Sequence, residues 1–153
     1  FNESPAGHVF TGIEAGEFSV RIQGRADSRR PLSRIEVVAS GEVVASIDPE
    51  NRKTTVGAFE SIIDETISFK NTGWLAVRCF EDHPEERVRF AHTNPVFVEL
   101  SGSALRPRRA EVLYFIARIR DELARNRKLL DEASIAEYQK ALDIYLEIAK
   151  RAR

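Results

Sequence analysis

A chain of 153 residues has the length of a single domain with one sizeable hydrophobic core. Its apolar fraction of 42% and charged fraction of 31% are ordinary for a globular protein, and it has no apolar run long enough to span a membrane. The net charge of -1 argues against a general polyanion binder, so we expect no nucleic-acid partner.

Cys79 is the only cysteine, which excludes an internal disulfide and a metal site built from several thiolates. It lies in an apolar segment, so we expect a packed core thiol. The chain contains no methionine and begins with Phe1. We therefore expect it to be a piece of a longer protein.

Short strands separated by turns are predicted over the first two-thirds of the chain. A short edge strand is expected around His8–Thr11, and strands are then expected at Phe18–Gln23, Ile35–Ala39, Val43–Ile47, Ala58–Phe69 and Trp74–Phe80. The tight reversal at Ser40, Gly41 and Glu42 predicts a hairpin, and residues 27–31 and 48–55 are expected to be turns or loops.

Two of these strands need further argument. Ala58–Phe69 also fits one face of a short helix, but its β-branched residues favour extended structure. Trp74–Phe80 sends Trp74, Ala76, Arg78 and Phe80 to one side and Leu75, Val77 and Cys79 to the other, as a central strand would.

Phe90–Leu100 joins this strand-rich part to a helical tail. Val96, Val98 and Leu100 alternate with Phe97 and Glu99, which predicts a strand with one face against a core. Pro95 suits the first position of such a strand. Six or seven strands without intervening helices predict an antiparallel immunoglobulin-like or fibronectin-like β-sandwich over residues 1–104, with an open barrel as the alternative.

Helical spacing of apolar residues begins after this strand. It predicts a first helix over Arg108–Lys128 with Pro107 in the first turn, followed by a second helix that starts at a capping box of Ser134 and Glu137. Residues 105–153 are therefore expected to form an antiparallel two-helix hairpin. Its apolar stripes must be covered by the other helix, by the sandwich or by a part of the parent protein that is missing from this chain.

No residue is predicted to be catalytic or to bind a cofactor or metal. His83 with Glu81, Asp82, Glu85 and Glu86 is the best local metal candidate, but no ligand spacing typical of a metal site is present, and a solvated acidic turn is the favoured interpretation. Nucleophile motifs and glycine-rich phosphate loops are also absent from the sequence.

We predict that an interaction surface includes Trp74, His92, Arg118 and Arg125. Trp74 can form a carbohydrate platform, although a tryptophan on a central strand usually belongs to the core. His92, with Thr93, is expected to satisfy backbone groups at the strand entry. The two arginines belong to a basic set on the first helix that can meet nucleic acid or anionic lipid, but a solvated face is favoured because acidic residues are interleaved with them.

Three segments resemble a known family: PLSRIEVVASGEVVAS at residues 31–46, GWLAVRCF at 73–80 and AHTNPVFVEL at 91–100. Together with the helical pair they resemble the C-terminal region of CehA/McbA-like metallohydrolases, relatives of carbaryl esterase in the polymerase-and-histidinol-phosphatase (PHP) superfamily. The resemblance implies a non-catalytic accessory β-sandwich with a helical cap. It also implies that divalent metal ions are bound by a preceding catalytic domain of the same polypeptide.

None of that family's metal ligands falls on a residue of this chain. The resemblance further implies that an extracytoplasmic location is plausible, and a homo-oligomer is left open. The alternative function is an immunoglobulin-like module that binds a glycan or another protein.

Overall fold

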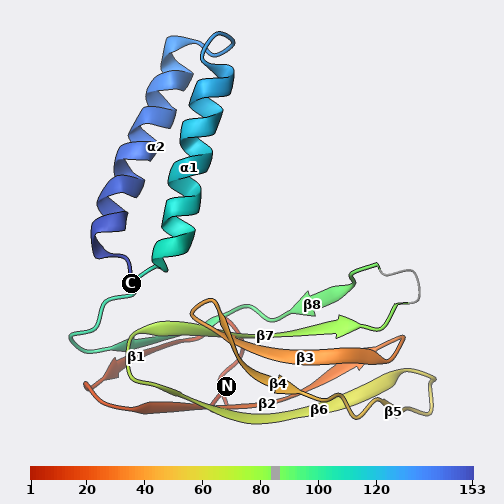
Figure 1. The fold of residues 1–153 in the computed structure, drawn as a ribbon. Helices are drawn as coiled ribbons and strands as arrows, with labels where there is room; N and C mark the ends of the chain where they lie inside the picture. The colour runs from red at the N-terminus through yellow and green to blue at the C-terminus, as the bar shows by residue number, and fades with distance from the viewer. Residues whose placement is uncertain (84–86) are drawn as a thin grey trace. The chain divides into compact units, whose positions relative to one another are not determined.

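The computed structural model describes residues 1–83 and 87–153, and Figure 1 shows its elements. The chain divides into two compact units, Phe1–Leu105 and Arg106–Arg153. This division lies one residue after the boundary expected from the sequence. The predicted residues Glu85 and Glu86 of the acidic turn lie outside the described residues.

The first unit is a β-sandwich of two sheets. Its strands are β1 Val9–Ile13, β2 Phe18–Ser28, β3 Leu32–Ala39, β4 Glu42–Ile47, β5 Arg52–Lys53, β6 Phe59–Phe69, β7 Gly73–Glu81, β8 Phe90–His92 and β9 Val96–Leu100. One sheet has the order β1-β9-β7-β3-β4 with β8 beside β7, and the other has the order β2-β6-β5. The predicted sandwich is confirmed, and two separate sheets replace the alternative of an open barrel. The β1–β9 pairing is parallel, whereas the other pairings are antiparallel.

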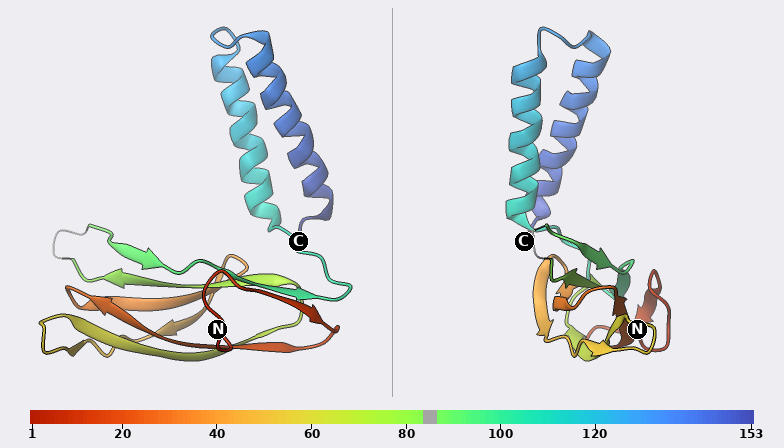
Figure 2. Two further views of the ribbon diagram at one scale, coloured as in Figure 1. Left: turned by 180° about the vertical axis from the view of Figure 1, so that it is seen from behind. Right: turned by 90° about the vertical axis from the view of Figure 1, so that its right-hand side faces the viewer.

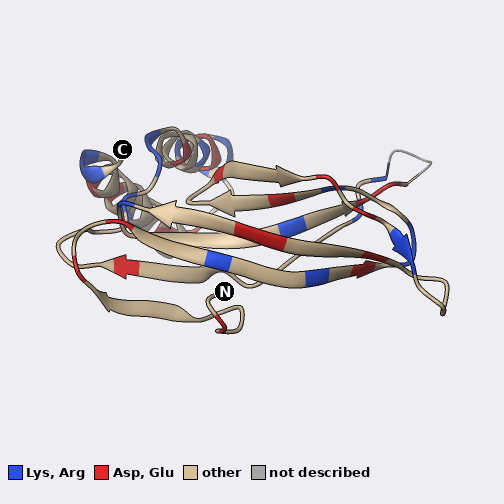
Figure 3. Ribbon diagram, turned by 90° about the horizontal axis from the view of Figure 1, so that it is seen from below, with Lys and Arg blue, Asp and Glu red and all other residues tan. Residues whose placement is uncertain are grey.

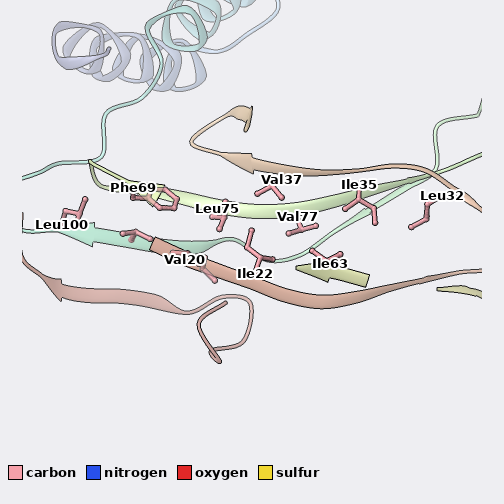
Figure 4. Close-up of a cluster of buried hydrophobic side chains, with 12 residues drawn as sticks. Val20, Ile22, Leu32, Ile35, Val37, Ile63, Phe69, Leu75, Val77 and Leu100 are labelled. Carbon is pink, nitrogen blue, oxygen red and sulfur yellow. The ribbon is translucent and has the colours of Figure 1, made fainter. Parts of the chain in front are cut away.

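The core fills the space between the two sheets. Figure 4 shows side chains of the six-stranded sheet and of the three-stranded sheet pointing toward one another. The cluster consists of Val20, Ile22, Leu32, Ile35, Val37, Ile63, Phe69, Leu75, Val77, Val96, Val98 and Leu100. Alternate residues of each strand therefore form this interface, as the period of two requires.

The β3–β4 hairpin is confirmed. Its turn consists of Ser40 at φ 49° and Gly41 at φ 91°. Two consecutive residues with positive φ match the twist of the flanking strands, and glycine takes this conformation at no steric cost. The hairpin fixes the register in which Ile35 pairs with Ile47, which places both on the inner face.

β7 is central, as predicted, because β3 lies on one side of it and β8 and β9 on the other. Thr93 lies between β8 and β9 and bonds both polar groups of Val77. The Val77 amide donates to Thr93 Oγ1 at 3.1 Å, and the Thr93 amide donates to the Val77 carbonyl at 2.9 Å. The expected backbone role of Thr93 is confirmed. The joint Phe90–Leu100 contains two strands, although only the second was predicted.

Other differences from the predicted elements are short extensions. β2 continues to Ser28, through a segment expected to turn at Asp27, and the expected loop 48–55 contains the two-residue strand β5. The extended interpretation of β6 over Phe59–Phe69 is confirmed. The predicted edge strand around His8 corresponds to β1, which is shifted toward Ile13.

The second unit is an antiparallel helical hairpin, as predicted, formed by α1 Arg109–Asn126 and α2 Glu132–Arg151 (Figure 2). Val112, Ile116 and Leu142 are its buried residues. The Arg109 amide donates to the Arg153 carbonyl at 2.7 Å, which ties the start of α1 to the end of the chain. Within the described residues, neither helix is both long and apolar enough to cross a membrane.

The helix ends differ from the prediction. α1 ends at Asn126 rather than Lys128, and Pro107 precedes the N-cap residue Arg108 instead of lying in the first turn. The predicted capping box at Ser134 is wrong, because α2 begins at Glu132 and Asp131 is its N-cap. Asp131 Oδ1 accepts the Ser134 amide at 2.8 Å, so Ser134 supplies a backbone donor rather than a cap.

The N-cap of α2 is expected to be sensitive to pH. The hydrogen bonds from the Ser134 backbone and side chain hold the pKa of Asp131 below its ordinary value. A lowered pKa in the folded state means that the cap stabilises α2 above the unfolded pKa and is lost as the pH falls through the folded pKa. We expect Asp131→Ala to lower the protection of the Ser134 amide against hydrogen exchange several-fold at neutral pH. The loss of this protection that acid causes in the parent chain should be absent from the variant.

Asp121→Ala is the control for this experiment, because Asp121 is an exposed acidic residue inside α1. It should leave Ser134 exchange unchanged. Equal exchange rates in Asp131→Ala and the parent chain would contradict the cap.

Candidate binding face

The outer face of the six-stranded sheet carries both a row of apolar side chains and a cluster of charged ones. It is formed by the residues that alternate with the buried ones on β3, β7 and β9. On β7, Leu75 and Val77 are buried in the core, so Trp74, Ala76 and Arg78 point away from it. The register then decides which side chains become neighbours across the strands.

An apolar strip crosses five strands at one end of this face. Trp74 pairs with Phe97, which pairs in turn with Val9 on β1. On the next row, Ala76 pairs with Val38, which pairs with Val43 on β4. Val9 is 41% exposed and Val43 is 47% exposed, while Trp74 and Phe97 are half-buried. Apolar side chains are therefore gathered on a face that points away from the core.

A charged cluster lies on the same face, farther along β3 and β7. Glu36 pairs with Arg78 across the strands, and Arg34 is two residues before Glu36 on β3. Glu36 Oε1 accepts Arg34 Nε at 2.8 Å, and Glu36 Oε2 accepts Arg78 Nε at 2.6 Å. We call these three residues, with Phe80, the arginine cluster. Its carboxylate is nearly buried on an outer sheet face, since Glu36 is only 9% exposed.

The arginines determine the ionisation of this carboxylate. Burial by itself would raise the pKa of Glu36, but the hydrogen bonds from Arg78 and Arg34 outweigh it and hold the pKa below the ordinary value. Both guanidinium groups also lie over Phe80, with Arg34 Cζ 3.6 Å and Arg78 Cζ 5.3 Å from the ring centroid. The cluster therefore carries one negative and two positive charges in a fixed arrangement.

An aromatic row continues from Phe80 onto β8. The Phe80 and Phe90 ring centroids are 5.9 Å apart with an interplanar angle of 29°, and Phe90 and His92 are 6.2 Å apart with an angle of 22°. Phe90 is 60% exposed and His92 is exposed as well. The row consequently places exposed aromatic rings beside the two guanidinium groups.

Two of the four predicted surface residues, Trp74 and His92, lie on this face. The interpretation of Trp74 as a core residue is corrected, because it is half-buried on the side of β7 opposite to Leu75. His92 is directly opposite Arg78, and its Nδ1 is 3.0 Å from the Thr93 carbonyl. That backbone contact agrees with the role expected from the sequence, and it fixes the ring at the end of the aromatic row.

The other two predicted residues, Arg118 and Arg125, come together on α1. Arg118 Nη2 is 3.2 Å and Arg125 Nη1 is 3.6 Å from Glu122 Oε1. One carboxylate thus offsets two arginines, in agreement with the solvated, charge-interleaved face expected there. Figure 3 shows that blue and red segments are also interspersed over the sandwich.

The remaining chemical candidates are dispersed. Cys79 is half-buried and packs against the sandwich core, as expected. His8 packs edge-on against Phe10 with ring centroids 4.6 Å apart. Among residues 1–83 and 87–153, no three His, Cys, Asp or Glu side chains are placed to hold a metal ion.

Sequence reasoning missed Arg34, Glu36, Phe90 and Phe97 as site residues. The alternation on β7 already placed Trp74, Arg78 and Phe80 on one face. The signal for Glu36 was available in part, because a charged residue between Ile35 and Val37 must point to the outer face. Its partners depend on the β3–β7 register, which the sequence does not show.

No protein-family model matches this chain, and no curated protein matches it. A solved structure described as "Structures of Clostridium thermocellum CbhA fibronectin(III)-like modules" is similar over 64% of this chain and 93% of its own length, with 13% identity and a TM-score of 0.32.

Proposed function

We propose that this chain is a non-catalytic accessory module of a PHP-type metal-dependent hydrolase and that it docks on the catalytic domain through the apolar strip. The strip is the observation that carries the proposal. Contiguous apolar side chains on an outer face are typical of interaction sites in soluble proteins. Tryptophan and phenylalanine at the centre of such a patch are the residues that contribute most to protein interfaces.

The resemblance of residues 31–46, 73–80 and 91–100 to CehA/McbA-like proteins supports this choice of partner. Two of those segments supply Trp74 and Phe97, so the strip falls within the region on which the resemblance rests. In this proposal the divalent metal ions are held by the preceding domain of the same polypeptide, and export of the parent protein is part of the same proposal.

Docking is tested on the complete polypeptide with a protease site introduced before Phe1. After cleavage, we expect the two parts to co-elute in gel filtration at micromolar concentration. Trp74→Ser combined with Phe97→Ser should separate them, because two central apolar contacts are lost. Ile62→Ser is the matched control, since Ile62 is 42% exposed on the three-stranded sheet and lies outside the strip.

Two outcomes would overturn the docking role. The parts of the unmodified protein would separate on cleavage, or Ile62→Ser would separate them as fully as the double variant. Circular dichroism of each variant shows that the sandwich and helices remain folded. The metal content of the complete polypeptide tests the assignment to a metal-dependent hydrolase independently. The polypeptide should contain Mn, Zn or Fe, and replacing His8, His83 and His92 by Gln should leave this metal content unchanged.

A second function, ligand binding by an immunoglobulin-like module, is favoured by the position of Trp74. A fully buried tryptophan would have argued against it, whereas Trp74 is half-buried on an outer face. Its test is a glycan array on which any signal is lost in Trp74→Ala. Loss of domain co-elution together with an unchanged array signal would instead assign Trp74 to docking alone.

A further inference from the structure

We propose that the arginine cluster and the aromatic row beside it form a binding site for the carboxylate-bearing sugars of an acidic polysaccharide. The site consists of Arg34, Arg78, Glu36 and Phe80 with Phe90 and His92. This site goes beyond both proposed functions, because neither domain docking nor the binding of a ligand at Trp74 uses these residues. It shares no residue with the docking strip.

The guanidinium groups of Arg34 and Arg78 can accept a ligand beside Glu36. Each arginine uses only Nε to bond Glu36, and within the described part of the chain the Nη groups of Arg34 and Arg78 make no hydrogen bond. Arg34 is 51% exposed and Arg78 is 40% exposed, measured on their side chains. Two paired Nη edges are therefore available to an oxyanion from solution, and guanidinium bonds carboxylates in a bidentate manner.

The two arginines are preorganised for binding. An exposed arginine loses side-chain freedom when it binds, and this loss opposes association. Here Glu36 holds both guanidinium groups through Nε, and both groups also lie over the Phe80 ring. Most of that freedom is already lost in the free protein. The cluster also retains a net charge of about +1, since one carboxylate faces two arginines.

Two aromatic rings lie beside the guanidinium groups. Phe90 and His92 are exposed residues along β8, next to Arg78 and Phe80. The C–H bonds of a pyranose ring pack well on exposed aromatic rings, and a uronate carries its carboxylate at the edge of the same pyranose ring. A uronate can therefore place its carboxylate on a guanidinium while its ring covers Phe90.

An acidic peptide fits this surface less well. A bound peptide strand needs backbone hydrogen bonds from an unpaired strand edge. β3 and β7 each have paired neighbours on both sides, so the arginine cluster lies inside the sheet. β8 pairs with β7 alone, but its three residues offer few backbone groups to a peptide strand. The main recognition groups are therefore the guanidinium groups and the exposed aromatic rings, which match a charged sugar.

The site is tested with trigalacturonate by titration calorimetry and by the side-chain NMR signals of His92. We expect saturable binding with a shift of the His92 imidazole signals. Arg78→Gln and Arg34→Gln should each weaken binding by at least about tenfold, as the loss of one charge-assisted contact predicts. Phe90→Ala should weaken it similarly and, because Phe90 is 60% exposed, should leave the sandwich folded.

Matched variants separate this site from general charge attraction. Arg21→Gln is the charge control, because Arg21 forms a comparable cross-strand pair with Asp64 on the other sheet and its side chain is 57% exposed. It should leave binding unchanged, as should Trp74→Ala on the docking strip. Glu36→Gln is the most informative variant. It removes a negative charge from the cluster, and it also removes the carboxylate that holds the two arginines in place. We expect it to weaken binding, whereas simple electrostatics predicts tighter binding.

Several results would overturn the proposal. These are no binding of trigalacturonate at millimolar concentration, unchanged or tighter binding in Glu36→Gln, or an equal loss in Arg21→Gln. Equal affinity for hexaglutamate or inorganic sulfate would also overturn it, because these anions cannot use the aromatic row. Failure of domain docking would not affect these measurements, so the two proposals are tested separately.

Discussion

Leu75→Ala is expected to lower the free energy of unfolding of the β-sandwich by about 3 kcal/mol, the middle of the range for leucine truncation in a well-packed core. Leu75 is fully buried near the start of β7 and belongs to the core cluster between the two sheets. It pairs with Ala39 on one side and Val96 on the other. Small, paired neighbours leave little freedom to close the cavity that the truncation creates.

The measurement uses the single tryptophan of the chain. Trp74 lies in the sandwich, so its fluorescence during urea unfolding follows that unit, while the far-ultraviolet signal at helical wavelengths follows mainly the hairpin. Leu75→Ala should shift the fluorescence transition and leave the slope with urea unchanged. Ile62→Ala, at a site 42% exposed, should cost less than about 1 kcal/mol. Equal shifts in both variants would contradict the assigned core.

The elements that the sequence predicted well are those in which local patterning agrees with the final burial. β9 is one case, because Val96, Val98 and Leu100 are all buried and the alternation is uninterrupted. The β3–β4 hairpin is another, because Ser40 and Gly41 carry the conformation that the turn requires. In both, side-chain period and turn chemistry point to the same structure.

β6 shows why other elements were ambiguous. Its inward row contains Ser61, which is 1% exposed, while Ile62 is exposed on the opposite side. A buried polar residue beside an exposed apolar one disguises the period of two. β2 was predicted too short for a related reason, since small residues at Gly24 and Ala26 give no strong signal where the strand continues to Ser28.

The candidate site depends on information that no local pattern contains. Alternation indicates the face to which Glu36 or Arg78 points, but their contact requires the β3–β7 register. The same limit applies to Trp74 and Phe97, which are brought together by the pairing of β7 with β9. Trp74 was assigned to the core because it lies on a central strand, although a central strand has two faces and here only one covers the core.

Asn51→Ala is expected to destabilise the sandwich almost as much as a core truncation, although Asn51 lies in a connection between strands. Its side chain bonds both backbone groups of Leu32: the Leu32 amide donates to Asn51 Oδ1 at 2.7 Å, and Asn51 Nδ2 donates to the Leu32 carbonyl at 2.9 Å. Its own amide donates to Ser61 Oγ at 3.0 Å. One residue thus joins β3 of one sheet to β6 of the other.

Two separate effects add in Asn51→Ala. Removing the side chain leaves the polar groups of the buried Leu32 without partners, and Asn51 also has a φ of 50°, which alanine adopts with strain. Together these effects should cost about 3 kcal/mol, since each of the two part-buried groups left unsatisfied costs about 1, the low end of the range, and a left-handed alanine costs about 1 more. Fluorescence-detected urea unfolding measures the total.

Asn51→Gly separates the two effects, because glycine adopts the left-handed conformation without strain and loses only the side-chain bonds. It should be less destabilising than Asn51→Ala. Asn51→Asp keeps the acceptor for the Leu32 amide but places a carboxylate oxygen against the Leu32 carbonyl, so it should also be destabilising despite its similar shape. If Asn51→Asp proved as stable as the parent chain, the bond to the Leu32 carbonyl would contribute nothing, and the connection between the sheets would depend on the bonds from the Leu32 amide to Oδ1 and from the residue 51 amide to Ser61.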